Sequence, residues 1–153
     1  MKTISILNEH DLTAAYELEL ICHPIPWSKE TFFSNQGERY LNFKITVANK
    51  IVGFCICQQV VDEATLFNIA IHPKYRKQGL AKALLNHLID ELMAISSPYK
   101  ISTLWLEVRR SNTPAIVLYQ SIGFNQITIR KNYYPSANGH REDAIIMAYT
   151  LAL

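Results

Sequence analysis

Hydrophobic and polar positions divide the chain into short segments of two kinds. Apolar runs rich in β-branched and aromatic residues predict strands, at residues 3–7, 40–48, 51–61, 65–71, 101–108, 124–134 and 143–151. Apolar residues at helical spacing predict helices, over 11–21, over 28–33, from residue 82 as far as 93, and over 112–122. The resulting order, β-α-α-β-β-β-α-β-α-β-β, predicts an α/β domain with one sheet flanked by helices.

Local signals set several of the boundaries. Ser28 is placed to cap the short helix that follows it. The pairs Asn49-Lys50 and Asp62-Glu63 predict two tight turns that join three consecutive strands. On the long helix, apolar residues that recur every three or four positions predict the buried face: Leu84, Leu85, Leu88, Ile89, Leu92 and Met93.

The composition is that of a folded domain. Of the 153 residues, 49% are hydrophobic and 18% are charged, so the chain is long enough for one core and too apolar to be disordered. We therefore expect a single domain over residues 1–153. The net charge of +2 is too small to indicate a nucleic-acid-binding surface. No apolar stretch has the length of a membrane span or the pattern of a signal peptide. No nucleic-acid or membrane partner is expected, and the expected location is cytoplasmic.

Three cysteines, Cys22, Cys55 and Cys57, form no CxxC pair. Cys55 and Cys57 lie two positions apart in a predicted strand and therefore share a face. This placement favours buried, reduced thiols, with a nucleophile or a metal pair as the alternative. No group of histidines, cysteines and carboxylates has the spacing of a zinc site, so no metal is predicted.

A basic loop separates the strand over 65–71 from the long helix. Gly79 and Ala81 keep side-chain bulk away from the start of the helix, and Lys77 and Lys82 add positive charge. Free N–H groups and the helix dipole favour anions at such a position, so the loop is a candidate phosphate site. An ordinary turn with a solvated basic rim is the alternative. The motifs of a P-loop and of a dinucleotide fold are both absent.

The pattern Arg76-x-x-Gly79-x-Ala81, placed directly after an apolar strand, resembles the cofactor loop of the GNAT acetyltransferases. The resemblance implies a central mixed, mostly antiparallel sheet split into a V, with acetyl-CoA as co-substrate. It implies that the backbone of one strand pairs with the pantetheine arm and that the loop holds the pyrophosphate. The residues so implied in cofactor binding are Ile69, Ala70, Ile71, Arg76, Lys77, Gln78, Gly79, Leu80, Ala81 and Lys82.

Acyl transfer to an amine needs a group that takes the proton of the amine and an acid that protonates the leaving thiolate. Glu107 lies among apolar residues near the end of a predicted strand, where burial would make its carboxylate a stronger base. Tyr119 follows Asn112 by seven positions on one predicted helix, so the two share a face. A solvent-facing glutamate, a tyrosine packed in the core and an asparagine that caps a helix remain open alternatives.

Longer segments resemble the RimI-type enzymes, a family of bacterial N-acetyltransferases that modify the N-terminal alanine of ribosomal small-subunit protein 18. The segments are PWS, NQGERYLNF, DEATLFNIA, WLEVR, NYYP and REDAIIM, starting at residues 26, 35, 62, 105, 132 and 141. The resemblance implies Glu107 as proton acceptor, Tyr119 as proton donor and Asn112 as a cofactor contact. Two departures are Ala81 at a Gly/Ala position and a loop over 136–140 of slightly different length.

By the same resemblance, Tyr133 and Tyr134 line the peptide entrance opposite the loop that holds Trp27, with ordinary strand aromatics as the alternative. The implied partner is the basic, arginine-rich N-terminus of a ribosomal protein. The acidic residues that are candidates to meet it are Glu38, Asp62 and Glu63. An α-amine suits the reaction, because its pKa of about 8 leaves roughly a tenth of it neutral at pH 7, against far less for a lysine amine.

The sequence therefore predicts an N-terminal acetyltransferase that works by direct attack in a ternary complex, since no cysteine lies in the motif. One alternative is a GNAT enzyme for a small amine or for other protein N-termini. The other is a non-catalytic module that senses acetyl-CoA or binds the ribosome. A monomer is favoured.

Overall fold

The computed structural model describes residues 1–136 and 138–152, and its elements follow the predicted order. The strands are β1 (Lys2–Ile6), β2 (Phe43–Val47), β3 (Lys50–Val60), β4 (Glu63–Ile71), β5 (Thr103–Arg109), β6 (Asn125–Pro135) and β7 (Arg141–Thr150). The helices are α1 (Leu12–Cys22), α2 (Lys29–Ser34), α3 (Leu80–Met93) and α4 (Thr113–Ile122), with 3₁₀ turns at Glu9–Asp11 and Pro73–Tyr75. Ser28 caps α2 as predicted, because its hydroxyl accepts a hydrogen bond from the N–H of Thr31.

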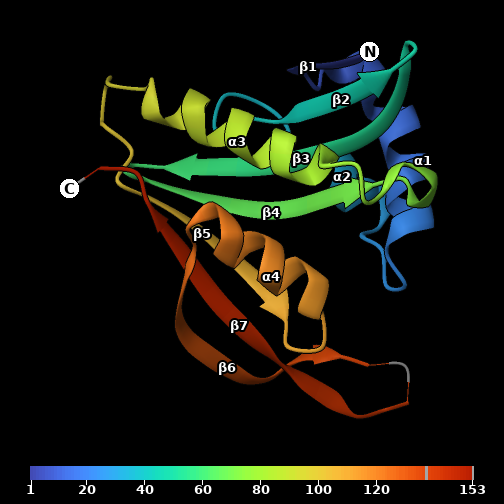
Figure 1. Ribbon diagram of the computed structural model, residues 1–153, viewed down its shortest axis with the longest axis vertical. Coiled ribbons are helices and arrows are strands. Elements are labelled where there is room, and N and C mark those ends of the chain that lie inside the picture. The colour runs from blue at the N-terminus through green and yellow to red at the C-terminus, as the bar shows by residue number, and fades with distance from the viewer. Residues whose placement is uncertain (137, 153) are drawn as a thin grey trace.

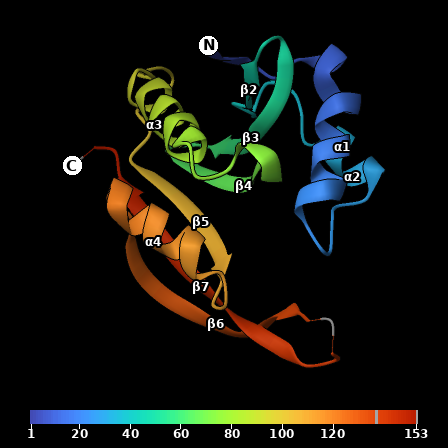
Figure 2. The same cartoon turned by 45° about the vertical axis from the view of Figure 1, so that its right-hand side comes forward.

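The seven strands form one sheet in the order β1-β2-β3-β4-β5-β7-β6, as Figure 1 shows. Every neighbouring pair is antiparallel except β4 and β5, which run parallel. Their pairing begins at Glu63 with Thr103 and ends at Leu66 with Leu106. Beyond these residues the two strands diverge and the sheet opens into a V (Figure 2). The predicted mixed, mostly antiparallel and split sheet is confirmed.

Helices cover both faces of the sheet. In Figure 2, α3 and α4 lie on one face, and α1 and α2 lie on the other face, against the half that carries β3 and β4. The larger core lies under α3 and α4, and the predicted stripe of α3 is buried in it except for Met93. Met93, the last residue of the helix, is 53% exposed and does not join this core. A smaller core packs α1 and α2 on the sheet through Leu12, Ala15, Leu18, Phe32, Phe54 and Ile56.

Two tight turns lie one residue earlier than the sequence suggests. The turn between β2 and β3 is centred on Ala48 and Asn49, whose φ angles of 50° and 65° are left-handed. In the next turn Val61 also takes a positive φ, of 56°. Two-residue hairpins need left-handed residues because their twist must match that of the strands. A β-branched valine rarely adopts a positive φ, so the residue type at position 61 does not indicate the turn.

A β-bulge in β4 changes the direction in which its side chains point. Two consecutive residues of β3 pair with Leu66 and Asn68, so Phe67 between them is an extra residue. Before the bulge, Leu66 packs into the core under α3. After it, Ala70 packs into the core beside α1. The bulge therefore turns the side chain of Asn68 toward α1.

The thiols of Cys55 and Cys57 are buried in the larger core, as predicted. Burial raises the pKa of the Cys55 thiol to about 12 and raises that of Cys57 as well. Cys22 is half-buried, and its thiol donates a hydrogen bond to the carbonyl oxygen of Ile71. Within residues 1–136 and 138–152, no three metal-binding side chains gather in one place, and no helix is long and apolar enough to cross a membrane.

Candidate active site

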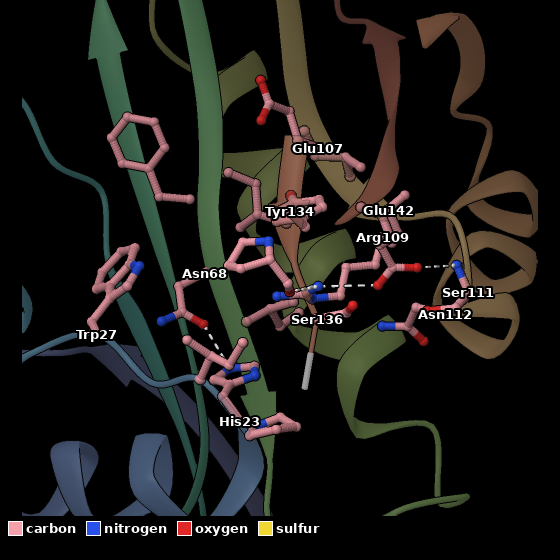
Figure 3. A pocket seen from close by; sticks show the side chains of 18 of the residues that line it. His23, Trp27, Asn68, Glu107, Arg109, Ser111, Asn112, Tyr134, Ser136 and Glu142 are labelled. Atoms are coloured by element: carbon pink, nitrogen blue, oxygen red, sulfur yellow. Dashed lines mark hydrogen bonds and ion pairs between the residues drawn. The ribbon is translucent and has the colours of Figure 1, made fainter. Parts of the chain in front are cut away.

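The open end of the V forms a cleft of about 540 Å³. Its walls come from the loop after α1, the bulged part of β4, the end of β5 with the start of α4, and the hairpin of β6 and β7 (Figure 3). Six of the residues that the sequence singles out line this cleft: Trp27, Ile69, Glu107, Asn112, Tyr119 and Tyr134.

A second hollow, of about 280 Å³, lies where the basic loop enters α3. Pro114 and Leu118 of α4 form its far side. Among the residues implied in cofactor binding, Ala70 and Gln78 line neither hollow. Ala70 packs beside α1. The predicted residues that do line the second hollow are Ile71, Arg76, Lys77, Gly79, Leu80, Ala81 and Lys82.

The loop before α3 has the geometry of an anion site. Gly79 caps the helix with a φ of 76°, and no atom lies within 4 Å of the place where a Cβ would be. The N–H of Ala83 is bonded to the carbonyl of Gly79, so the first N–H groups of α3 precede the helical ladder and remain available. With the helix dipole and the charges of Lys77 and Lys82, they favour a phosphate group. Arg76 braces the loop, because its Nε donates to a carbonyl oxygen at the end of β4 at 3.0 Å.

Glu107 does not lie in the apolar surroundings that its sequence neighbours suggest. Its side chain is 31% exposed, and its Oε1 accepts a hydrogen bond from the guanidinium of Arg130 on β6 at 2.9 Å. Strand alternation is the reason: Leu106 and Val108 point into the core, and Glu107 points to the opposite face. The expectation of a buried carboxylate is therefore wrong, and Glu107 is a partly exposed side chain at the edge of the cleft.

Tyr119 reaches the cleft from the core side. It is 6% exposed and packs against Phe124, with ring centroids 5.7 Å apart. Burial, together with the neighbouring Tyr134, raises the pKa of the Tyr119 hydroxyl to about 12, so the group stays protonated near neutral pH. Glu107 and Tyr119 lie on opposite faces of the sheet. They share one cleft because β4 has separated from β5 there.

Asn112 caps α4, which is one of the two roles that the sequence leaves open for it. Its Oδ1 accepts a hydrogen bond from the N–H of Ala115 at 3.3 Å, at the first turn of α4. The same residue also lines the cleft. Its capping contact therefore fixes part of the cleft wall.

Tyr133 and Tyr134 form an aromatic pair near the hairpin of β6 and β7, with ring centroids 5.0 Å apart. The guanidinium of Arg130 lies 4.1 Å from the ring centroid of Tyr133, and that of Arg109 lies 4.5 Å from the ring centroid of Tyr134. Tyr134 lines the cleft, and partial burial raises the pKa of its hydroxyl to about 12. Tyr133 is 38% exposed and lies outside the cleft wall, where it stacks on Arg130.

A bulge of three residues in β6 sets the position of this pair. Residues 131–133 of β6 lie opposite the single residue Asp143 of β7. Asn132 takes a left-handed φ of 52°, and its N–H donates to Oδ1 of Asp143 at 3.0 Å. Arg141 donates to the carbonyl oxygens of Asn132 and Tyr133, at 2.8 and 2.7 Å. The sequence assigned Arg141 and Asp143 no role, and the only signal was their place in the segment REDAIIM.

Glu142 lies between these two residues on β7 and points into the cleft. Its carboxylate accepts hydrogen bonds from the N–H of Ser111 at 3.3 Å and from the guanidinium of Arg109 at 3.0 Å. These bonds hold the pKa of Glu142 below its usual range. The side chain of Glu142, on β7, is therefore bonded to the last residue of β5 and to the turn that follows it.

The acidic residues expected to meet a basic peptide are not at the cleft. Asp62 and Glu63 lie at the turn between β3 and β4, at the closed end of the V, and Glu38 also lies outside the cleft wall. Of the loop over 136–140, Ser136 lines the cleft, and residue 137 lies outside the described residues. The carboxylates that do line the cleft are Glu19, Glu107 and Glu142.

Three polar side chains that the sequence did not single out meet at the base of the cleft. Glu19 lies on α1 and His23 directly follows that helix. Asn68 lies on β4 just past the bulge, and Figure 3 shows it beside His23. Nδ2 of Asn68 donates to Glu19 at 2.8 Å, and Oδ1 of Asn68 lies 3.0 Å from Nε2 of His23. No local pattern links residues that are 45 and 49 positions apart.

Comparison with known proteins identifies the family. The sequence profile of the acetyltransferase (GNAT) family matches residues 12–124. The chain belongs to this family. This GNAT chain is 58% identical over 153 residues to the [ribosomal protein bS18]-alanine N-acetyltransferase of Escherichia coli strain K12, with 100% of both chains covered. It is 52% identical over 148 residues to the protein of the same name from Haemophilus influenzae, covering 97% of this chain and 98% of the relative.

Solved structures agree with this assignment. The crystal structure of the ribosomal-protein-S18-alanine N-acetyltransferase from Escherichia coli matches with a TM-score of 0.94 at 58% identity, over 100% of this chain and 96% of the other. Arabidopsis thaliana NAA60 in complex with a bisubstrate analogue matches with a TM-score of 0.83 at 22% identity, over 98% of each chain, and shows a shared fold. The predicted GNAT fold and the family resemblance are confirmed.

Proposed function

We propose that this GNAT chain transfers the acetyl group of acetyl-CoA to the α-amine of the N-terminal alanine of ribosomal protein bS18. The observation that carries the proposal is the 58% identity, over the full length of both chains, to an enzyme of that name. The cleft supports it, because Glu107 and Tyr119 present a carboxylate and a protonated phenol on its two sides. Acyl transfer to an amine requires such a base and such an acid.

In the proposed reaction the neutral α-amine attacks the carbonyl carbon of the thioester directly. A C–N bond forms as the C–S bond breaks, Glu107 takes the proton that the amine loses, and Tyr119 gives its proton to the departing sulfur. Both protein groups return to their starting state by exchanging a proton with water. Direct transfer suits this cleft, because none of the three cysteines is among the residues that line it.

For acetyl-CoA, we assign the pyrophosphate to the hollow at the start of α3, held by the loop over 76–82. The pantetheine arm is assigned to the edge of β4 beyond the split. There Ile69, Ala70 and Ile71 have no pairing to β5, so the backbone groups of this stretch that face away from β3 can bond an extended chain as a neighbouring strand would. The carbonyl oxygen of Ile71 is not among them, because it already accepts from Cys22 and Arg76. Asn112, at the start of α4, contacts the cofactor from the other wall.

The peptide is assigned to the cleft between Trp27 and Tyr134, with Tyr133 stacked outside it. The carboxylates of Glu107 and Glu142, which line the cleft, favour a basic N-terminal segment, whereas both oxygens of Glu19 are already hydrogen-bonded within the protein. The proposed unit is a monomer with one domain, residues 1–153, that needs neither nucleic acid nor a membrane. Its place of action is the cytoplasm, where ribosomal proteins are made.

Mass spectrometry after incubation with acetyl-CoA tests the proposal. We expect a peptide that begins Ala-Arg-Tyr to gain one acetyl group at its α-amine, and the same peptide with a blocked N-terminus to gain none. Glu107→Gln should lower turnover by roughly 10²–10⁴ while leaving acetyl-CoA affinity unchanged. Acetylation of spermidine but not of the peptide would instead indicate a small-amine enzyme. Binding of acetyl-CoA without turnover on either substrate would indicate a non-catalytic module.

A further inference from the structure

Glu19 is a carboxylate buried at the base of the cleft, with 1% of its surface exposed. Its Oε1 accepts a hydrogen bond from Nδ2 of Asn68 at 2.8 Å, and its Oε2 accepts one from the backbone N–H of Trp27 at 2.9 Å. A carboxylate this deeply buried is unfavourable unless its oxygens are hydrogen-bonded. Glu19 therefore constrains the positions of both donors.

His23 closes a triangle with these residues. Its Nε2 lies 3.0 Å from Oδ1 of Asn68 and 3.4 Å from Oε1 of Glu19. Nδ2 of Asn68 donates to Glu19, so Oδ1 of Asn68 faces His23. Since this oxygen can only accept, Nε2 of His23 must carry the proton of the hydrogen bond. The three side chains tie the end of α1 to the part of β4 that follows the bulge.

This tie holds one wall of the cleft in place. Trp27 is fixed at both of its backbone polar groups, since its N–H donates to Glu19 and its carbonyl oxygen accepts from the hydroxyl of Tyr16 at 2.9 Å. Between the anchored ends of the loop over 23–27, Ile25 is 51% exposed and lines the cleft. Phe67, the extra residue of the bulge, is 43% exposed and lines the same cleft from β4. The tie therefore sets the separation of two apolar walls.

We propose that Glu19 is a positioning residue that fixes the loop over 23–27 against β4 and so sets the space for the first side chain of the peptide substrate. The proposal rests on the function proposed above, because it takes the cleft to be the peptide site. Glu19 acts through the N–H of Trp27 and through Asn68. A wall held at a fixed distance accepts a small first residue and rejects a large one.

Glutamine and alanine at position 19 should behave differently. In Glu19→Gln, the side-chain oxygen can accept from Trp27, and the side-chain amide can donate to Asn68 after the amide of Asn68 flips. Asn68 then donates to His23 in its other tautomer, so the network closes again without a charge. Glu19→Ala removes both acceptors and leaves two buried donors unsatisfied.

The experiment compares Glu19→Ala, Glu19→Gln and the control Glu17→Ala, which removes an exposed carboxylate two positions earlier on α1. The measurements are kcat and KM for peptides that begin with Ala or with Leu, the affinity for acetyl-CoA, and Tm. For Glu19→Ala we expect KM for the Ala peptide to rise about tenfold and the preference for Ala over Leu to fall about tenfold. Its kcat should change less than about threefold, with unchanged affinity for acetyl-CoA. Glu19→Gln and Glu17→Ala should stay within about twofold of the parent in every value.

A folded Glu19→Ala protein with unchanged KM and unchanged preference overturns the proposal. So does a Glu19→Gln protein that loses as much as Glu19→Ala, because the charge and not the tie would then matter. If Glu19→Ala does not fold, Asn68→Ala breaks the tie from the strand side and carries the same expectation and the same refutation. A parent that acetylates no Ala peptide contradicts the proposed function as well. An active parent with unaffected variants contradicts only the positioning role.

Discussion

Arg130 donates a hydrogen bond to Glu107 across 2.9 Å, and the same guanidinium lies 4.1 Å from the ring centroid of Tyr133. One side chain of β6 therefore holds both the proposed base and an aromatic residue of the hairpin. The two charged side chains are 49% and 31% exposed, so the pair orients the carboxylate more than it stabilises the fold.

We expect Arg130→Gln to lower kcat for the Ala peptide about two- to fivefold, because an ion pair this exposed contributes roughly 0.5–1 kcal/mol. Steady-state kinetics measures the effect, and Tm should stay the same. Lys131→Gln makes the same change of charge one residue along β6 and should leave kcat unaltered. An equal loss in Lys131→Gln would assign the effect to net charge instead of to the contact with Glu107.

Tyr119→Phe keeps the ring and its packing on Phe124 and removes one hydroxyl. If that hydroxyl protonates the leaving thiolate, kcat and kcat/KM should fall together by at least about tenfold, while the binding of both substrates barely changes. Single-turnover transfer to an Ala peptide, with CoA release followed in parallel, measures the chemical step. A rate within about twofold of the parent would make Tyr119 a packing residue and leave water as the proton source.

The raised pKa of Tyr119 also predicts how stability depends on alkaline pH. In the unfolded chain the hydroxyl of Tyr119 loses its proton near pH 10, whereas in the folded protein its pKa is about 12. This contribution to stability is fully present below pH 10 and is lost as pH rises through 12, and the complete loss amounts to about 3 kcal/mol. Urea unfolding at pH 7 and pH 11 should therefore show a smaller alkaline loss for Tyr119→Phe than for the parent. Equal losses would contradict the prediction.

Gly79→Asn tests the anion loop without straining it, because asparagine tolerates the left-handed conformation. Its side chain should obstruct the hollow and weaken acetyl-CoA binding at least about tenfold, by calorimetry, with little change in Tm. Gly139, with a φ of 81° and no atom within 4 Å of a Cβ, offers the matched control. Gly139→Asn should bind acetyl-CoA normally. A folded Gly79→Asn with normal affinity would place the pyrophosphate elsewhere.

Asp143→Ala should loosen the bulge of β6, because it leaves the N–H of Asn132 without its acceptor. Tyr134 then loses its fixed place in the cleft wall, so we expect KM for the peptide to rise about three- to tenfold with a smaller change in kcat. Arg110→Gln is the control, since it breaks only the exposed pairing of Asp143 with Arg110. If both variants raise KM equally, the ion pair and not the bulge is responsible.

The order of the elements could be predicted because local signals determine it. Ser28 caps α2 within one turn of its own position, and the apolar periods of α3 and β5 mark their buried faces. Glu107 is the exception in β5. Its apolar neighbours suggested burial, but the period of two that buries Leu106 and Val108 also turns Glu107 to the other face.

The base of the cleft could not be predicted, because it depends on register. Asn68 meets Glu19 only because Phe67 is inserted ahead of it as a bulge, and one inserted residue reverses the direction of every side chain that follows. The same holds for Arg141 and Asp143, whose contacts exist only because three residues of β6 face one of β7. Such irregularities are decided by pairing between distant strands, and a single sequence carries little trace of them.

The irregular course of β6 also affects the outer border of the sheet. β6 is an edge strand, and Ile127 and Ile129 on it are 54% and 37% exposed. A long, regular edge with exposed apolar residues is a template on which another chain can add a strand and begin to aggregate. The bulge over 131–133 breaks the run of evenly spaced backbone groups, and Arg130 and Lys131 put positive charge before it and within it. The distortion that brings Tyr134 to the cleft therefore also protects the protein against self-association along this edge.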